Sequence, residues 1–183
     1  MPEPVVKATA AAHRAGFTMS CDPGTGSLLA VLAAAVPAGG RILELGTGAG
    51  VGTAWITHGL ADRTDVEVVT VDIDPGAAAG LSWPSHVRLV VGDAVEVTAR
   101  EGTFDLIFAD AQGGKWHGLD VTVAALRPGG QLLVDDMTPP SFADSHHEQK
   151  TAEVRDALLG SPDLVSVAVA WSTGLILSTR RHT

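Results

Sequence analysis

Cysteine and basic residues are scarce in this chain of 183 residues. Its single cysteine, Cys21, excludes an intrachain disulfide and a zinc site built from several cysteines. The 12 Lys and Arg residues stand against 21 Asp and Glu residues, which gives a formal net charge of −9. Because proteins that bind nucleic acid normally present a basic face, this balance disfavours nucleic acid as a partner.

Aromatic residues and long apolar runs are scarce as well. Tyrosine is absent, and Phe and Trp together make up 4% of the chain. The longest apolar run covers residues 28–36, whereas a helix that spans a bilayer needs about 20 apolar residues. Residues 1–4, Met-Pro-Glu-Pro, lack the basic and apolar regions of a secretory signal. We therefore expect a cytoplasmic protein without a membrane segment.

The rest of the composition is that of a globular protein, with 45% apolar and 18% charged residues. A chain of this length predicts one domain, which we divide into an N-terminal arm (1–22) and a core (23–183). The first 20 residues form either a helix or a loose arm. Asp22 and Pro23 then have the residue types of an N-cap and a first helical position, so a helix is expected over 23–36.

Beyond residue 40, short runs rich in Val, Ile and Leu alternate with segments long enough for helices. Strands are predicted at 41–45, 66–72, 87–91, 104–110 and 131–135. Helices are predicted at 51–60, 76–81, 94–100, 118–126 and 145–159, the fourth of them stopped by Arg-Pro-Gly-Gly at 127–130. Two final strands, 164–170 and 175–179, surround a turn and predict a hairpin. The pattern indicates an open α/β sheet with helices on both faces.

The strongest motif is the glycine-rich segment 44–52, ELGTGAGVG, which directly follows the first strand. Glycines allow a ligand to approach the backbone closely. A dinucleotide-binding loop needs G-x-G-x-x-G, and neither candidate register has glycine at the last position. The pattern acid-x-G-x-G-x-G does match, from Glu44 through Gly46, Gly48 and Gly50, and it is typical of S-adenosylmethionine loops. A glycine-rich turn without a ligand is the alternative.

Acidic residues follow the next strands, at the sheet edge where α/β proteins bind ligands. Asp72 could accept hydrogen bonds from both ribose hydroxyls of a nucleoside. Asp93 follows the third strand, near the expected position of an adenine ring. For both residues the alternative is a role as helix N-cap.

Three more carboxylates close the fourth and fifth strands, namely Asp110, Asp135 and Asp136. Two like charges about 4 Å apart repel by about 4 kcal/mol at an effective dielectric of 20, and a divalent cation or a proton would relieve this. All-oxygen ligands suit Mg²⁺, Mn²⁺ or Ca²⁺. The alternative is that Asp110 is a lone acid and Asp136 is solvated. His146 and His147 are not predicted as a metal-ligand pair, because adjacent residues on a helix point in different directions.

The ordered segments ILELGTGAGVGTAWI, VVTVDIDP, VVGDA, FDLIFADA, LRPGGQLLVDDM and STGLILSTRR resemble the class I methyltransferases. Among these, the chain is most similar to the cation-dependent O-methyltransferases of catechol and caffeoyl-CoA type and their small bacterial relatives. The resemblance covers about residues 20–180. It implies a Rossmann-like, doubly wound, mostly parallel sheet of seven strands with a C-terminal antiparallel hairpin.

The resemblance also implies roles for single residues. For S-adenosyl-L-methionine it implies the amino-acid end at Glu44, Gly46, Thr47 and Gly48, the ribose at Asp72, the adenine at Asp93 and Ala94, and further cofactor contacts at Gly50, Ile73 and Asp110. For the metal it implies Asp110, Asp135 and Asp136, with Mg²⁺ expected, or Mn²⁺ or Ca²⁺. The acceptor is expected to be a small molecule with a hydroxyl group, such as a catechol.

One segment departs from the family pattern. Larger relatives read Asp-Ala-Asp-Lys after the fourth strand, whereas this chain reads Asp110-Ala-Gln-Gly-Gly-Lys115. Lys115, the only lysine nearby, is the candidate base that acts together with Asp110, and a solvated loop lysine is the alternative. Trp116 is expected beside the acceptor.

Other functions stay open at this point. They are a nicotinamide-dependent oxidoreductase, an RNA methyltransferase of the same fold, a metal-independent methyltransferase and a cofactor-binding module without activity. A homodimer is also left open, with the apolar run 28–36 as a contributor. Packing of that run on the sheet is the alternative.

Overall fold

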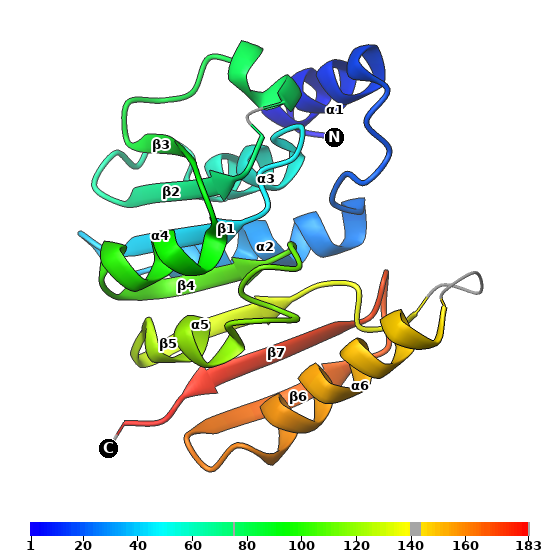
Figure 1. Cartoon of the computed structure of the whole chain (residues 1–183). Helices are drawn as coiled ribbons and strands as arrows, with labels where there is room; N and C mark the ends of the chain where they lie inside the picture. The colour runs from blue at the N-terminus through cyan, green and yellow to red at the C-terminus, as the bar shows by residue number, and fades with distance from the viewer. Residues whose placement is uncertain (75, 140–143, 183) are drawn as a thin grey trace.

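A seven-stranded sheet runs through the protein, in the order β3-β2-β1-β4-β5-β7-β6. The computed structural model describes residues 1–74, 76–139 and 144–182 (Figure 1). The strands are β1 (Arg41–Leu45), β2 (Glu67–Asp72), β3 (Val87–Val91), β4 (Phe104–Ala109), β5 (Leu126–Val134), β6 (Leu164–Val169) and β7 (Leu175–Arg180). The first five strands are parallel, and β7 pairs antiparallel with both β5 and β6. The predicted fold class and the C-terminal hairpin are confirmed.

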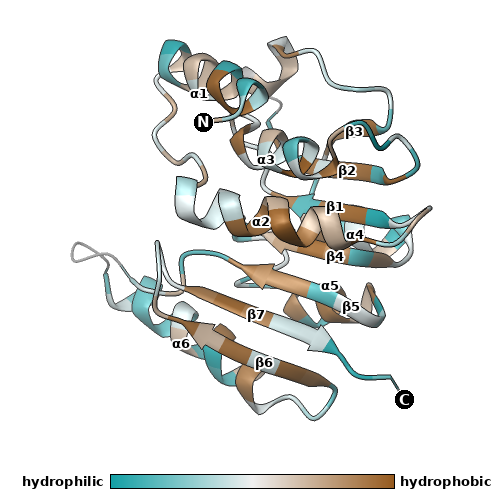
Figure 2. Cartoon of the chain, turned by 180° about the vertical axis from the view of Figure 1, so that it is seen from behind, coloured by the Kyte–Doolittle hydropathy of each residue, from teal (hydrophilic) through white to brown (hydrophobic). Residues whose placement is uncertain are grey.

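Helices cover both faces of the sheet (Figures 1 and 2). The helices α2 (Pro23–Ala35) and α3 (Val51–Leu60) pack on one face, and α4 (Ala94–Glu101), α5 (Leu119–Ala124) and α6 (Ser145–Gly160) lie on the other. The first helix, α1 (Glu3–Ala15), packs against α3 at the outside of the molecule. Among the described helices, none has the length and apolar character needed to cross a membrane.

The strand sequences explain this layering, because alternate residues point to opposite faces. Ile42 joins the core beneath α2 and α3, whereas Leu43 and Leu45 join the core beneath α4 and α6. All three side chains are fully buried. Burial of each stabilises the folded state by roughly 1.5–3 kcal/mol relative to an exposed side chain. Continuous apolar runs are therefore required here, as in other parallel sheets covered on both sides.

The helix starts follow the predicted capping chemistry. The side chain of Asp22 accepts a hydrogen bond from the Gly24 N–H at 2.8 Å, with Pro23 at the first helical position. Within the apolar run 28–36, Leu29, Leu32, Ala33 and Val36 are buried in the core beneath α2. Packing on the sheet thus accounts for most of that run, and the homodimer stays a prediction.

Two predicted elements differ from the structure. The segment 127–130, expected to end a helix, lies inside β5, which begins at Leu126 instead of 131. The pairing of β4 with β5 shifts register between Phe104 and Leu106, and such an irregularity accommodates Pro and Gly within a strand. The predicted helix 76–81 is a 3-10 helix over Gly76–Gly80.

Candidate active site

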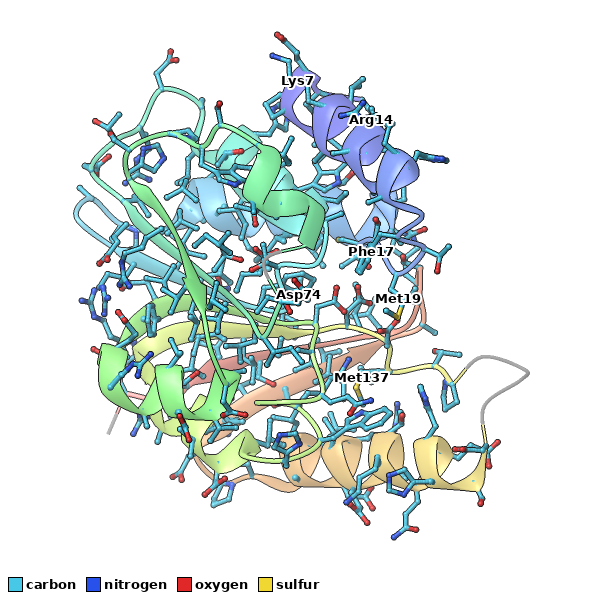
Figure 3. All side chains as sticks on the ribbon, turned by 45° about the horizontal axis from the view of Figure 1, so that its top comes forward. Lys7, Arg14, Phe17, Met19, Asp74 and Met137 are labelled. Carbon is cyan, nitrogen blue, oxygen red and sulfur yellow. The ribbon has the colours of Figure 1, made fainter. Side chains whose placement is uncertain are left out.

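A cavity of about 710 Å³ opens at the carboxyl ends of β1, β2, β4 and β5. Its volume lies in the usual range for small-molecule sites. The segment between α1 and α2 forms one wall with Phe17 and Met19, and Asp74 contributes from beyond β2 (Figure 3). The predicted site residues that line it are Glu44, Gly46, Thr47, Gly48, Asp72, Asp110, Lys115, Asp135 and Asp136. The fold thus brings the predicted cofactor loop and the predicted catalytic residues into one cavity.

The glycine loop folds back on the end of β2. The N–H groups of Gly46 and Thr47 donate to the Val71 carbonyl at 2.9 and 3.1 Å, and the Gly48 N–H donates to Asp72 Oδ2 at 2.8 Å. Gly46 has φ +100°, and a Cβ there would lie 2.7 Å from a carbonyl oxygen at the end of β4. Only glycine therefore allows the loop to pass between the two strand ends.

Glu44 lies beneath this loop, at 1% exposure. Its Oε2 accepts hydrogen bonds from the hydroxyls of Thr70, at 2.6 Å, and Thr53. Burial raises the pKa of Glu44 to about 7, the two hydroxyls oppose this, and the charge of Asp72 adds to it. Oε1 finds no hydrogen-bond partner within the described ranges, and a Cβ at Gly52 would lie 2.1 Å from it. A buried carboxylate oxygen without a partner is suited to a cationic ligand group.

Four predicted cofactor residues do not line the cavity. Gly50 adopts φ +83° as the N-cap of α3, and the Ile73 side chain is 78% exposed. Asp93 caps α4, since its Oδ1 accepts two backbone N–H groups at 2.9 and 3.0 Å. Ala94 is the first residue of that helix. Their contacts with a cofactor stay predictions.

Asp135 is tied into the protein by several donors. Its Oδ1 accepts hydrogen bonds from the Asp136 N–H at 2.7 Å, the Thr25 hydroxyl at 3.4 Å and the Thr173 hydroxyl. Burial raises the pKa of Asp135, and the bonds from Thr173 and the Asp136 N–H oppose this rise. The side chain of Asp136 is 52% exposed. The two neighbouring carboxylates are therefore in different environments.

Lys115 places a cation among these acids. Its side chain is 5% exposed, and Nζ donates to the Asp135 carbonyl at 3.2 Å and lies 3.7 Å from Asp136 Oδ2. Burial raises the pKa of Asp110 well above its ordinary value, the charge of Lys115 opposes this, and the charges of Asp135, Asp136 and Glu44 add to it. Lys115 is thus not a solvated loop residue.

The predicted metal triad is not assembled as a ligand set. In the part of the chain that the structure describes, no three His, Cys, Asp or Glu side chains are grouped so that they could hold a metal ion. Asp135 Oδ1 is engaged by protein donors, and the Lys115 ammonium lies close to both Asp135 and Asp136. The arrangement of Asp110, Asp135 and Asp136 therefore does not fit a divalent cation.

Several cavity residues had no signal in the sequence. Phe17 and Met19 come from a connection, and Thr173 comes from the hairpin turn. His147 also lines the cavity, and its ring packs edge to face on that of Trp116, with 4.9 Å between the ring centroids. The sequence analysis considered the two adjacent histidines only as metal ligands. His147 lines the cavity because of where α6 packs, which the sequence does not reveal.

Comparison with known proteins identifies the family. Residues 43–137 match the family model described as "Methyltransferase domain". A protein of Mycolicibacterium vanbaalenii named "Putative O-methyltransferase" is 33% identical over 176 residues, which cover 87% of this chain and 76% of that protein. The fold is that of a class I methyltransferase. The chain belongs to the methyltransferase-domain family and is an S-adenosylmethionine-dependent O-methyltransferase.

Solved structures share the fold over the whole chain. The O-methyltransferase TomG of Streptomyces achromogenes, solved in complex with S-adenosylmethionine, is 24% identical with a TM-score of 0.78, and the match covers 100% of this chain and 91% of that one. An O-methyltransferase of Bacillus cereus, in complex with S-adenosylhomocysteine, is 18% identical with a TM-score of 0.75, at coverages of 99% and 92%. At these identities the likeness concerns the fold alone.

Proposed function

We propose that this protein transfers the methyl group of S-adenosylmethionine to a hydroxyl of a small, catechol-like or other phenolic molecule. The observation that carries this proposal is the shared cavity, which is lined both by the glycine loop and by Lys115 and Trp116. Such a cavity can hold a cofactor and an acceptor side by side. The net charge of −9 favours a small acceptor over RNA.

The chain's own residues would hold the cofactor by its charges and hydroxyls. The unpaired Oε1 of Glu44 would accept from the cofactor's ammonium group. The carboxylate of Asp72, held by the Gly48 N–H, would accept from the ribose hydroxyls. Asp93 and Ala94 would lie toward the adenine, with Ile73 as a further cofactor contact.

The part of the cavity beside Trp116 would bind the acceptor. Trp116 and His147 supply aromatic surfaces there. A flat ring would stack against such side chains. Polar groups for its hydroxyl are present at Asp110, Asp136 and Lys115, which line the same cavity.

Bound S-adenosylmethionine supplies a methyl group on a positively charged sulfur. The protein would hold the acceptor oxygen about 3–3.5 Å from that carbon and in line with the bond that breaks. Acidic side chains at Glu44, Asp72 and Asp110 suit a cationic cofactor. Since the carboxylates near Lys115 do not fit a divalent cation, no step is assigned to a metal.

The test combines cofactor binding with turnover. Isothermal titration with S-adenosylhomocysteine should show binding to the wild type, loss of binding in Asp72→Ala, and unchanged binding in Asp62→Ala, whose side chain is exposed. A panel of phenols and catechols should then yield methylated product. Absence of cofactor binding by the wild type would contradict the proposal.

A further inference from the structure

Two glycines place Lys115 in the cavity wall. Gly114 has φ +84°, and a Cβ there would lie 2.4 Å from Leu45 Cδ1 and 2.9 Å from Thr122 Oγ1. The Thr122 hydroxyl donates to the Gly114 carbonyl at 2.8 Å. Since only glycine permits this close packing, the loop buries the stem of Lys115 and leaves its ammonium at the cavity.

The ammonium has capacity for a ligand. A lysine has three N–H donors, and within the described residues Nζ makes one hydrogen bond, to the Asp135 carbonyl. The carboxylate of Asp136 lies 3.7 Å away, as an ion pair beyond hydrogen-bond distance. Donors therefore remain for an oxygen atom in the cavity.

We propose that the Lys115 ammonium supplies the positive charge at the acceptor oxygen in place of a divalent cation, so that this protein methylates phenolic hydroxyls without an added metal. The inference rests on the proposed function. It follows from two observations. The carboxylates are not grouped for a metal, and a buried cation of the protein bonds the Asp135 carbonyl and lies 3.7 Å from the Asp136 carboxylate.

The chemistry favours a phenol. Its O–H proton passes to water in the cavity, and the resulting oxyanion accepts a hydrogen bond from Lys115 Nζ. The oxygen then forms a bond to the methyl carbon, while the carbon–sulfur bond breaks and its electron pair stays on sulfur. The products are an aryl methyl ether and S-adenosylhomocysteine. A fixed cation helps because it stabilises the oxyanion on which the attack depends.

The first experiment measures turnover of the phenol panel in EDTA and in Mg²⁺. We expect kcat/KM to be the same in both for the wild type and to fall about 10²- to 10³-fold in Lys115→Met. Lys115→Arg, which keeps the charge, should retain more activity than Lys115→Met. Lys150→Met is the matched control, because Lys150 lies on α6 and pairs with Glu153 of the same helix. Activity that EDTA abolishes and Mg²⁺ restores would overturn the proposal, as would full activity in Lys115→Met.

The second experiment separates a charge effect from a structural one. The visible spectrum of 4-nitrophenol bound to the complex with S-adenosylhomocysteine, in EDTA, reports its ionisation. We expect the wild type to lower the pKa of the bound phenol, and Lys115→Met to abolish that shift while it binds S-adenosylhomocysteine normally. An equal spectrum in both proteins would contradict the proposal. If Lys115→Met does not fold, Lys115→Arg must still show the lowered phenol pKa, and its absence would be contrary evidence.

The outcomes distinguish this inference from the proposed function. Loss of S-adenosylhomocysteine binding by the wild type would defeat both. Normal cofactor binding with no methylation of any phenol would likewise defeat both. Methylation of a phenol that depends on Mg²⁺, or that is unchanged in Lys115→Met, would defeat the inference alone.

Discussion

Replacement of Glu44 by Gln should stabilise the free protein at pH 8 and leave its stability almost unchanged at pH 4. Glu44 is buried beneath the glycine loop with one carboxylate oxygen unpaired. Gln can still accept from the hydroxyls of Thr53 and Thr70, which bond the other oxygen in the wild type. The substitution therefore removes a buried charge while it keeps the packing and the hydrogen bonds that hold the side chain.

The magnitude follows from the pKa of Glu44, which burial raises to about 7 from an ordinary 4.5. This difference corresponds to roughly 3 kcal/mol. A raised pKa means that the folded state binds the proton more tightly than the unfolded state. Below pH 4.5 both states are protonated and the cost is absent, and it grows until the pH passes about 7. The gain in stability from Glu44→Gln should follow the same course.

Urea denaturation followed by circular dichroism, at several pH values between 4 and 8, measures this gain as the difference between variant and wild type. Other titrating groups cancel in that difference. Asp156→Asn is the control, because Asp156 is exposed on α6, and its effect should not change with pH in this way. A Glu44→Gln effect that is constant with pH, or of opposite sign, would refute the reasoning.

Three further predictions concern the same cavity. The affinity for S-adenosylhomocysteine should rise about tenfold from pH 6 to pH 8, as Glu44 ionises, and calorimetry on Glu44→Gln should show a flat profile; a parallel rise in both would count against an ionic contact. Gly114→Ala should cost about 1–3 kcal/mol in urea denaturation, through strain at positive φ and the contact with Leu45, and should lower turnover through Lys115; wild-type stability would contradict this. Cys21 should react slowly with iodoacetamide in the folded protein, because burial first, and then nearby carboxylates, raise the pKa of its thiol; rapid labelling would be the contrary result.

The sequence was sufficient for the sheet and for the acidic residues that the strand ends contribute to the cavity wall. Buried parallel strands need continuous apolar runs, and ligands gather at the carboxyl ends of such strands. Glu44, Asp72 and Asp110 therefore lie where the strand pattern predicts them. The start of β5 was not predictable, since Pro and Gly at 127–130 have the composition of a turn, and only pairing with β4 makes that segment a strand.

The partners of the carboxylates were beyond the reach of sequence reasoning. Asp135 is bonded by hydroxyls of Thr25 and Thr173, which are distant in sequence and come from α2 and the hairpin turn. Thr25 lies outside the segments that carry the family resemblance, and the segment that contains Thr173 assigns it no role. An aspartate at a strand end has the same sequence pattern whether it binds a metal or accepts hydrogen bonds from the protein. Only the tertiary structure distinguishes these two roles.

The loop that carries Lys115 departs from the Asp-Ala-Asp-Lys pattern that the resemblance leads us to expect after the fourth strand. Two glycines stand between the end of β4 and the lysine, and one of them adopts a conformation that a side chain would strain. The loop packs against Leu45 and Thr122, and its lysine lies among the carboxylates that a metal would otherwise neutralise. A buried ammonium and a divalent cation would compete for the same acidic surroundings, because each relieves the repulsion between the same carboxylates. On the proposal made above, the position that this loop gives to Lys115 is what would allow a side-chain cation to take the place of a metal.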